Sequence, residues 1–239
     1  ADVTLADGVD LITASAGTSN VRIGVNAGNS ITSGGNYNVV VGDEAGTAIT
    51  TGDNIVAVGY GAGDALTLGS SNTAVGMDSL TNEVAGHNNT AIGKGALQAQ
   101  TTASSGLVNN TAVGRDAGLS ITSGIQNTIV GSLAGDALTD ADDNVAIGSE
   151  ALSTDTQGSK SVAIGREALR QQNFSSATNS NNTAVGYRAG LLVTTGTDNT
   201  LMGTEAGDAL TTGITNVAIG TGALSADVAG HRTVAIGYN

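Results

Sequence analysis

The sequence predicts an all-β protein, a parallel β-solenoid (β-roll) in which the chain winds through thirteen coils of about 17 residues. A motif, Asn-(Thr/Val)-Ala-(Val/Ile)-Gly, recurs at nearly constant spacing, which is typical of a repeat architecture. The unit is too short for a helix pair, and its Gly, Asn and β-branched residues disfavour helix. Aromatic residues make up only 2% of the chain, which indicates a thin core shared along a rod.

The motif glycine marks each coil. These glycines stand at positions 24, 42, 59, 76, 93, 114, 131, 148, 165, 186, 203, 220 and 237. The difference between successive positions is 17 in nine cases, 18 in one case and 21 in two cases. Because a 21-residue interval closes each group of four coils, we predict 72-residue modules at about 38–109, 110–181 and 182–239. They lie in one repeat domain, 20–239, after a cap or junction segment, 1–19.

Each coil is expected to hold two short strands and two turns. The first strand ends at the motif glycine, which supplies a positive φ or a crowded backbone position. The second carries an aliphatic residue, two hydroxyl residues and a glycine, as in Ile49–Gly52. The motif asparagine is expected to tolerate left-handed geometry and to stack into an amide ladder. The recurring asparagines are Asn38, Asn72, Asn89, Asn110, Asn127, Asn144, Asn182, Asn199 and Asn216.

The first strand is apolar on both faces. Its side chains alternate, so Thr or Val and then Val or Ile lie on one face, and mainly Ala lies on the other. One face fills the coil, and the other must meet something else. We predict that the Ala-rich face contacts further copies of the chain. The predicted self-association residues are Val40, Ala74, Ala91, Ala112, Ile129, Ala146, Ala163, Ala184, Leu201, Ala218 and Ala235.

Composition excludes several classes of function. The chain has no Cys, so it can form no disulfide and no thiolate metal site. Its net charge of −13 disfavours nucleic acid as a partner. No apolar run approaches the roughly 18 residues of a membrane helix, so we expect no membrane insertion.

Catalytic motifs are missing from the sequence. His87 and His231 occupy the same loop position in different modules, too far apart to share a metal, and are interpreted as solvated turn residues. The glycine cluster Gly59–Gly63 is a consequence of the repeat, since no helix follows it. We therefore expect no enzyme activity and no cofactor. A structural calcium ion at Asp140, Asp142 and Asp143 is the one metal site considered.

The motif resembles a known family. The runs Asn144-Val-Ala-Ile-Gly148 and Ser161-Val-Ala-Ile-Gly165 are similar to the head repeats of trimeric autotransporter adhesins and to β-solenoid repeats of bacteriophage tail fibres. The resemblance covers residues 20–237. It implies a left-handed parallel β-roll, usually a homotrimer, displayed outside the cell or on a virion.

The leading functional hypothesis is a structural extracellular fibre or adhesin segment that associates with itself. The expected assembly is a homotrimer or a head-to-tail homopolymer. A host-surface receptor or a glycan would bind the long loops Gln98–Leu107 and Arg170–Ser180. The head-to-tail form, a self-assembling filament subunit, is the first alternative, because Ala1 of another copy can fill the Ala position expected after Asn239, although the joined spacing from Gly237 to Gly24 would be 26 residues, longer than 21.

Two further alternatives remain. Ice binding would need a flat threonine array, but the outward-facing threonines are missing from two successive coils of each module. The candidate threonines are Thr32, Thr50, Thr67, Thr122, Thr139, Thr194 and Thr211. A glycan-cleaving enzyme would need paired carboxylates and is also expected to use aromatic sugar platforms, which are nearly missing here.

Overall fold

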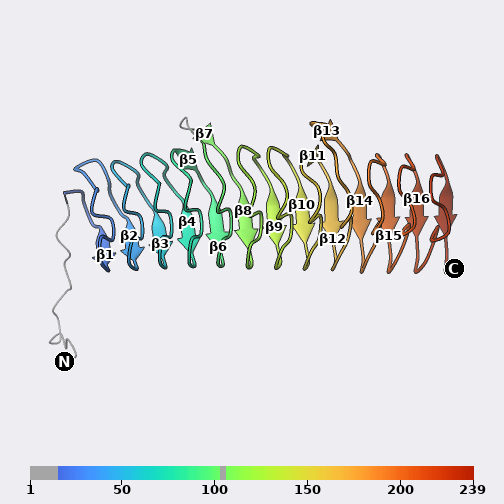
Figure 1. The fold of residues 1–239 in the computed structure, drawn as a ribbon, viewed down its shortest axis with the longest axis horizontal. Helices are drawn as coiled ribbons and strands as arrows, with labels where there is room; N and C mark the ends of the chain where they lie inside the picture. The colour runs from blue at the N-terminus through green and yellow to red at the C-terminus, as the bar shows by residue number, and fades with distance from the viewer. Residues whose placement is uncertain (1–15, 103–105) are drawn as a thin grey trace, which may run out of the picture.

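The computed structural model describes residues 16–102 and 106–239, and they form a rod of stacked coils (Figure 1). One parallel sheet of 13 strands runs along it, with the strands side by side in chain order. Its strands are β1 (Val21–Ile23), β2 (Val39–Val41), β3 (Val56–Val58), β4 (Thr73–Val75), β6 (Thr90–Ile92), β8 (Thr111–Val113), β9 (Thr128–Val130), β10 (Val145–Ile147), β12 (Val162–Ile164), β14 (Thr183–Val185), β15 (Thr200–Met202), β16 (Val217–Ile219) and β17 (Val234–Ile236). The predicted solenoid of thirteen coils is confirmed.

Each coil pairs with the next without a register shift. Ala146 of β10 lies opposite Ala163 of β12, and the same motif positions are matched in every other pair of neighbouring strands. At about 4.8 Å per step, thirteen coils extend roughly 60 Å. The part of the chain that the structure describes contains no helix able to cross a membrane.

The motif glycine is required for two reasons. Gly131 has a φ of 141°, a region that side chains rarely adopt. A Cβ atom there would also lie 2.5 Å from the carbonyl oxygen of Gly148 in the next coil. Both predicted roles of this glycine, positive φ and backbone crowding, are therefore present.

The expected second strand of each coil does not form. Residues 49–52 are bent rather than extended, although the Thr50 and Thr51 N–H groups still donate to the Thr67 carbonyl oxygen of the next coil. The chain closes a short coil here, so it turns continuously instead of running straight. Four short strands form two small sheets elsewhere: β5 (Gly86–His87) with β7 (Gly106–Leu107), and β11 (Gly158–Ser159) with β13 (Thr178–Asn179). Both small sheets lie along the same edge of the rod (Figure 1).

The recurring asparagines form a ladder, as expected, but with the backbone as the main partner. Asn127 Nδ2 donates to the Ala141 carbonyl oxygen at 2.8 Å, and its Oδ1 accepts the Asn144 N–H at 3.0 Å. Direct amide-to-amide bonds occur only at some positions, as from Asn127 to Asn110 at 3.2 Å. The expectation of left-handed geometry is wrong for Asn127 itself. The residue before it, Gln126, has the positive φ of 61°.

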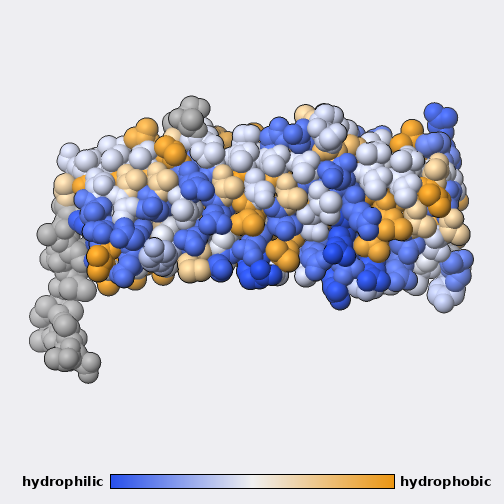
Figure 2. Space-filling view, in the orientation of Figure 1, coloured by the Kyte–Doolittle hydropathy of each residue, from blue (hydrophilic) through white to orange (hydrophobic). Residues whose placement is uncertain are grey.

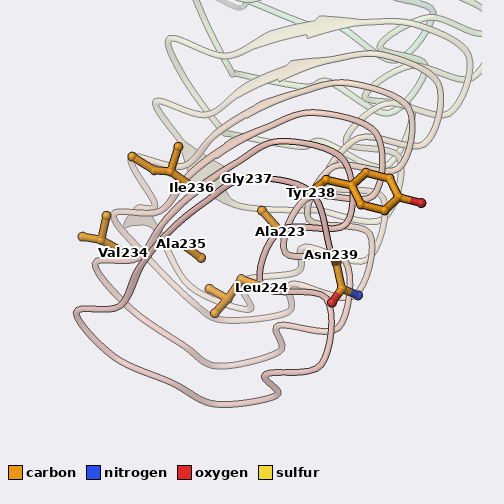
Figure 3. A pocket seen from close by; sticks show the side chains of 8 residues that line it. All are labelled: Ala223, Leu224, Val234, Ala235, Ile236, Gly237, Tyr238 and Asn239. Atoms are coloured by element: carbon orange, nitrogen blue, oxygen red, sulfur yellow. The ribbon is translucent and has the colours of Figure 1, made fainter.

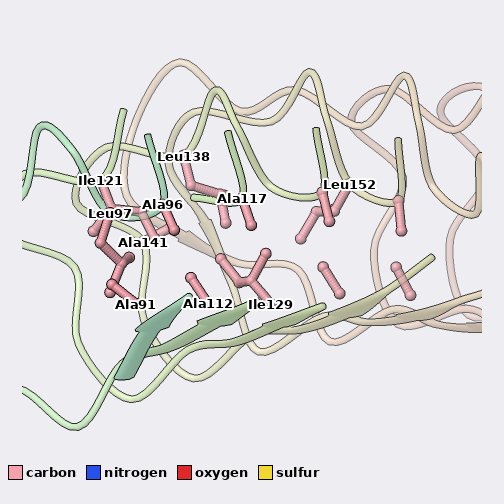
Figure 4. Close-up of a cluster of buried hydrophobic side chains, with 14 of the residues drawn as sticks. Ala91, Ala96, Leu97, Ala112, Ala117, Ile121, Ile129, Leu138, Ala141 and Leu152 are labelled. Atoms are coloured by element: carbon pink, nitrogen blue, oxygen red, sulfur yellow. The ribbon is translucent and has the colours of Figure 1, made fainter. Parts of the chain in front are cut away.

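The core is a single row of small and branched aliphatic side chains inside the coils. In the 13-stranded sheet, the middle residue of every strand from β2 onward points inward and faces alanine, leucine and isoleucine from the opposite wall (Figure 4). Among the labelled side chains, Ala91, Ala112 and Ile129 come from the strand side, and Ala117 and Leu138 come from the opposite side. The interior is narrow, so one wall contributes mostly methyl groups.

Two types of coil fill this interior differently. In the first type, a second glycine stands four positions after the motif glycine. A buried Ile, Leu or Val stands three positions after that second glycine. A Cβ on Gly135 would lie 2.9 Å from Leu138 Cδ1, so the Leu138 side chain takes the space that a side chain on Gly135 would need. In the second type the glycine is replaced by leucine, and the later residue is an acid or glutamine. The second-type pairs are Leu80 with Glu83, Leu97 with Gln100, Leu152 with Asp155, Leu169 with Gln172, and Leu224 with Asp227.

Candidate functional site

The assignment of the two strand faces is corrected by the structure. The Ala-rich face lies inside the coils, so it cannot contact another copy of the folded chain. Ten of its predicted self-association residues are fully buried: Val40, Ala74, Ala91, Ala112, Ile129, Ala146, Ala163, Ala184, Leu201 and Ala218. The eleventh, Ala235, is partly buried and packs against the same core. In the last described coil, Ala235 points inward toward Leu224, whereas Val234 and Ile236 point away from the core (Figure 3).

The other strand face forms a continuous apolar surface. We call it the outer sheet face, defined by the first and third residues of each strand in the 13-stranded sheet. All of its third residues are Val, Ile or Met, and all of its first residues are Val or Thr. No charged side chain lies on it, although the chain carries a net charge of −13. The acidic residues are therefore confined to the other sides of the rod.

The side chains of the outer sheet face are mostly half-buried by their neighbours in adjacent coils. Its more exposed members within the rod include Ile92 at 38%, Met202 at 43% and Ile219 at 38% exposure. A three-residue strand covers about 10 Å, so a face roughly 60 Å long has an area of about 600 Å². Two such faces in contact would bury about 1,200 Å², which reaches the lower limit of specific protein interfaces.

The two long loops are anchored by buried polar networks that the sequence analysis did not find. Glu83 is fully buried, and its Oε1 accepts the N–H groups of Val84, Ala85, Gly86 and Thr102. Gln100 Nε2 donates to the other carboxylate oxygen of Glu83 at 2.7 Å. The carboxylate thus fixes its own turn and the beginning of the loop in the next coil.

The second module repeats this network at the equivalent positions. Asp155 accepts the N–H groups of Gly158 and Phe174, both at 3.0 Å, and the Gln172 side chain at 2.6 Å. Gln172 Oε1 in turn accepts a hydrogen bond from Asn182 Nδ2 at 2.8 Å. In the sequence, these buried networks could have been recognised from the leucine that stands three positions before each buried acid, Glu83 and Asp155.

The two histidines take part in hydrogen bonds between coils. His87 Nδ1 accepts the Ser70 N–H at 2.9 Å, and His231 Nδ1 accepts the Ile214 N–H at 3.1 Å. In the middle module Ser159 Oγ accepts the Asp142 N–H in the same way. The histidines are therefore more than the solvated turn residues expected from the sequence.

The acidic residues form no metal centre in the described residues, where no group of three His, Cys, Asp or Glu side chains could hold an ion. Of the three acids considered for calcium, Asp142 uses its Oδ1 to accept the Ile125 N–H at 2.8 Å. Asp140 Oδ1 lies 3.1 Å from the Thr139 hydroxyl oxygen, whose single hydrogen it shares with the Thr156 carbonyl oxygen at 3.0 Å.

Three other aspartates, at equivalent positions of successive modules, carry a carboxylate oxygen that is buried without a hydrogen-bond partner: Asp64, Asp136 and Asp208. Burial is the main cause that raises the pKa of each of these carboxyl groups. Nearby negative charges raise the pKa further: Glu44 acts on Asp64, Asp116 and Glu150 act on Asp136, and Glu205 acts on Asp208. These carboxylates are therefore poorly stabilised in their charged form.

The threonines considered for ice binding use their hydroxyl groups within the rod. Thr50 Oγ1 donates to the Thr67 carbonyl oxygen at 2.9 Å, and Thr67 Oγ1 donates to that of Val84 at 3.1 Å. The other five donate in the same way to a carbonyl of the next coil: Thr32, Thr122, Thr139, Thr194 and Thr211. Their hydroxyl hydrogens are thus committed to holding coils together.

Comparison with known proteins finds no family model, no curated protein and no solved structure that matches this chain. The outer sheet face and the anchored loops therefore carry the functional argument.

Proposed function

We propose that this protein is a structural extracellular rod, a fibre or adhesin segment, whose copies associate through the outer sheet face. The observation that carries the proposal is the uncharged, mostly aliphatic surface along all 13 strands of a chain with a net charge of −13. The largest apolar patch on a monomeric soluble protein is typically about 300–600 Å² and is often functional, so a face of about 600 Å², at the upper end of this range, favours a partner.

A second copy of the chain is the occupant that this surface fits best. The face repeats every coil and lacks charge, so two or three copies can pack along their whole length without burying an unpaired charge. The resemblance to adhesin heads favours a homotrimer. Extracellular display, a host receptor or glycan on the loops, head-to-tail assembly and ice binding remain predictions.

The test is the mass of the assembly in solution. We expect sedimentation velocity of the wild-type chain at micromolar concentration to give a defined oligomer, with three copies expected from the resemblance. The double variant Ile92→Asp/Val130→Asp should be monomeric, because each copy would bury two carboxylates in the interface. Its circular dichroism spectrum should remain that of the wild type.

A matched control places the same charge elsewhere. Ser123 is exposed in a bend outside the strands, so Ser123→Asp should leave the oligomer intact. A strictly monomeric wild-type chain, or a double variant that still assembles, would refute association through this face. A mass that grows without limit as concentration rises would instead favour the filament.

A further inference from the structure

An open groove lies at the foot of the second long loop. It has a volume of about 530 Å³ and is lined by Thr154, Arg170, Gln171, Asn173 and Thr194. These residues come from three successive coils, and every one of them is polar. Figure 2 shows hydrophilic and hydrophobic side chains interspersed over one face of the rod.

The groove is held in shape by the buried network beneath it. Gln172, between two lining residues, is fully buried and donates to Asp155 at 2.6 Å and to Ser161 Oγ at 2.9 Å. The backbone on either side is bonded to the next coil, since the Gln171 N–H donates to Leu191 O and the Asn173 N–H donates to Thr194 O. The side chains of Gln171 and Asn173 are therefore exposed on a fixed backbone.

The groove offers both hydrogen-bond donors and acceptors. Arg170 contacts Glu150 through its Nε atom at 3.0 Å, and its two terminal nitrogens carry further N–H groups. The Thr156 hydroxyl donates to the Phe174 carbonyl oxygen at 2.8 Å and lies 3.3 Å from Asn173 Oδ1, so the Asn173 amide offers both an acceptor and donors to the groove. Gln171 and Thr154 add an amide and a hydroxyl. Glu150, which does not line the groove, pairs with the Nε edge of Arg170, so the terminal N–H groups are the ones that a ligand carboxylate can contact, beside neutral side chains that suit hydroxyl groups.

We propose that this groove binds an acidic sugar, a hexuronate unit, with Arg170 contacting its carboxylate and the amide and hydroxyl side chains contacting its ring hydroxyls. The net charge of −13 disfavours ligands with many negative charges, such as nucleic acid. An open groove of this kind gives weak binding for one sugar unit, with a dissociation constant on the order of 1 mM.

The first long loop supplies an internal comparison. The positions that correspond to the lining residues in the preceding module are Asn82, Gln98, Ala99, Thr101 and Thr122. In the first module Gln98 stands at the position of Arg170, and Ala99 stands at the position of Gln171. The equivalent surface therefore has no cation. The site is therefore a feature of the second module that the first module lacks.

Saturation-transfer difference NMR tests the proposal, because it detects weak ligands on a protein of any assembly state. We expect saturation transfer to D-glucuronate and much weaker transfer to D-glucose. Arg170→Gln should weaken glucuronate binding at least tenfold. Arg115→Gln, an exposed arginine outside the groove, should bind as the wild type does.

Three results would overturn the inference. They are no transfer to glucuronate, unchanged binding by Arg170→Gln, or competition by acetate or sulfate as strong as that by glucuronate, which would indicate an unspecific anion contact. Because sedimentation measures association independently, a failure here would leave the proposed rod function untouched.

Discussion

At the scale of single residues, the recurring asparagine contributes most to the rod, because its side chain bonds both within its coil and to the next coil. Asn127 closes its own coil through Ala141 and supports the following coil through the N–H of Asn144. The recurrence of asparagine made a ladder predictable. Its partners were not predictable, because only the folded coil brings the distant Ala141 carbonyl within reach of the amide.

Asn127→Ala should destabilise the protein by about 2–4 kcal/mol, because it leaves a buried carbonyl and a buried N–H without partners. Urea unfolding followed by circular dichroism measures the change. Asn88 is exposed and has a φ of 63°, so Asn88→Gly is a matched control that should change stability little. A loss below about 0.5 kcal/mol for Asn127→Ala would contradict the ladder's role.

Asp136→Asn should stabilise the rod at neutral pH. Burial raises the pKa of the Asp136 carboxyl above its ordinary 3.8, and the charges of Asp116 and Glu150 raise it further, although a backbone hydrogen bond partly offsets this. The folded state therefore binds this proton more tightly than the unfolded state. The resulting stability is present below pH 3.8 and is lost as pH rises through the raised pKa.

The measurement is the urea midpoint of the wild type and the variant between pH 4 and pH 7. The variant should gain most at pH 7, and its stability should fall less as pH rises. Equal pH dependence of the two proteins would show that Asp136 is well solvated in the folded state.

At the scale of the coil, the space inside is shared between two positions on the same turn. In one arrangement a glycine is followed three positions later by a bulky aliphatic residue, as in Gly135 and Leu138. In the other a leucine is followed by an acid or glutamine, as in Leu152 and Asp155. Both arrangements occur repeatedly in the chain. Leucine is accepted at this position with a φ of 54° at Leu152, so the backbone tolerates a side chain there when the second position is vacated. The replacement pattern is visible in the sequence, but its cause is a shared volume that only the folded coil reveals.

Gly135→Leu alone should destabilise by about 1–3 kcal/mol, because the new side chain overlaps Leu138 and Ile129. Adding Leu138→Ala should recover part of this loss, since it empties the contested space. A double-mutant cycle from thermal or urea unfolding gives the coupling, expected to exceed about 0.5 kcal/mol. Additive effects would show that the two positions do not compete for space.

At the scale of the whole molecule, an acidic rod carries one long apolar face. Each copy has a net charge of −13, so copies repel one another at long range, and in the proposed assembly the outer sheet faces supply the attraction at contact. The balance between these two effects should make assembly depend on salt.

Raising ionic strength from about 0.01 M to about 0.15 M shortens the Debye length from about 30 Å to about 8 Å. Association should therefore tighten several-fold over this range, as measured by sedimentation equilibrium. Sodium chloride is the appropriate salt, because sulfate also strengthens apolar burial. Association that weakens with salt would indicate an interface held by ion pairs rather than by the apolar face.

The sequence alone determined the repeat, the number of coils and the parallel stacking. A short repeating unit with a glycine at each strand end admits few other folds. The tertiary structure decided which strand face lies inside. Both faces are apolar, so alternation could not distinguish them, and the Ala face was placed on the wrong side. Inside a narrow coil, leucine and isoleucine from the opposite wall leave room mainly for methyl groups, so Ala146 and its equivalents lie within and the larger Val145 and Ile147 face outward.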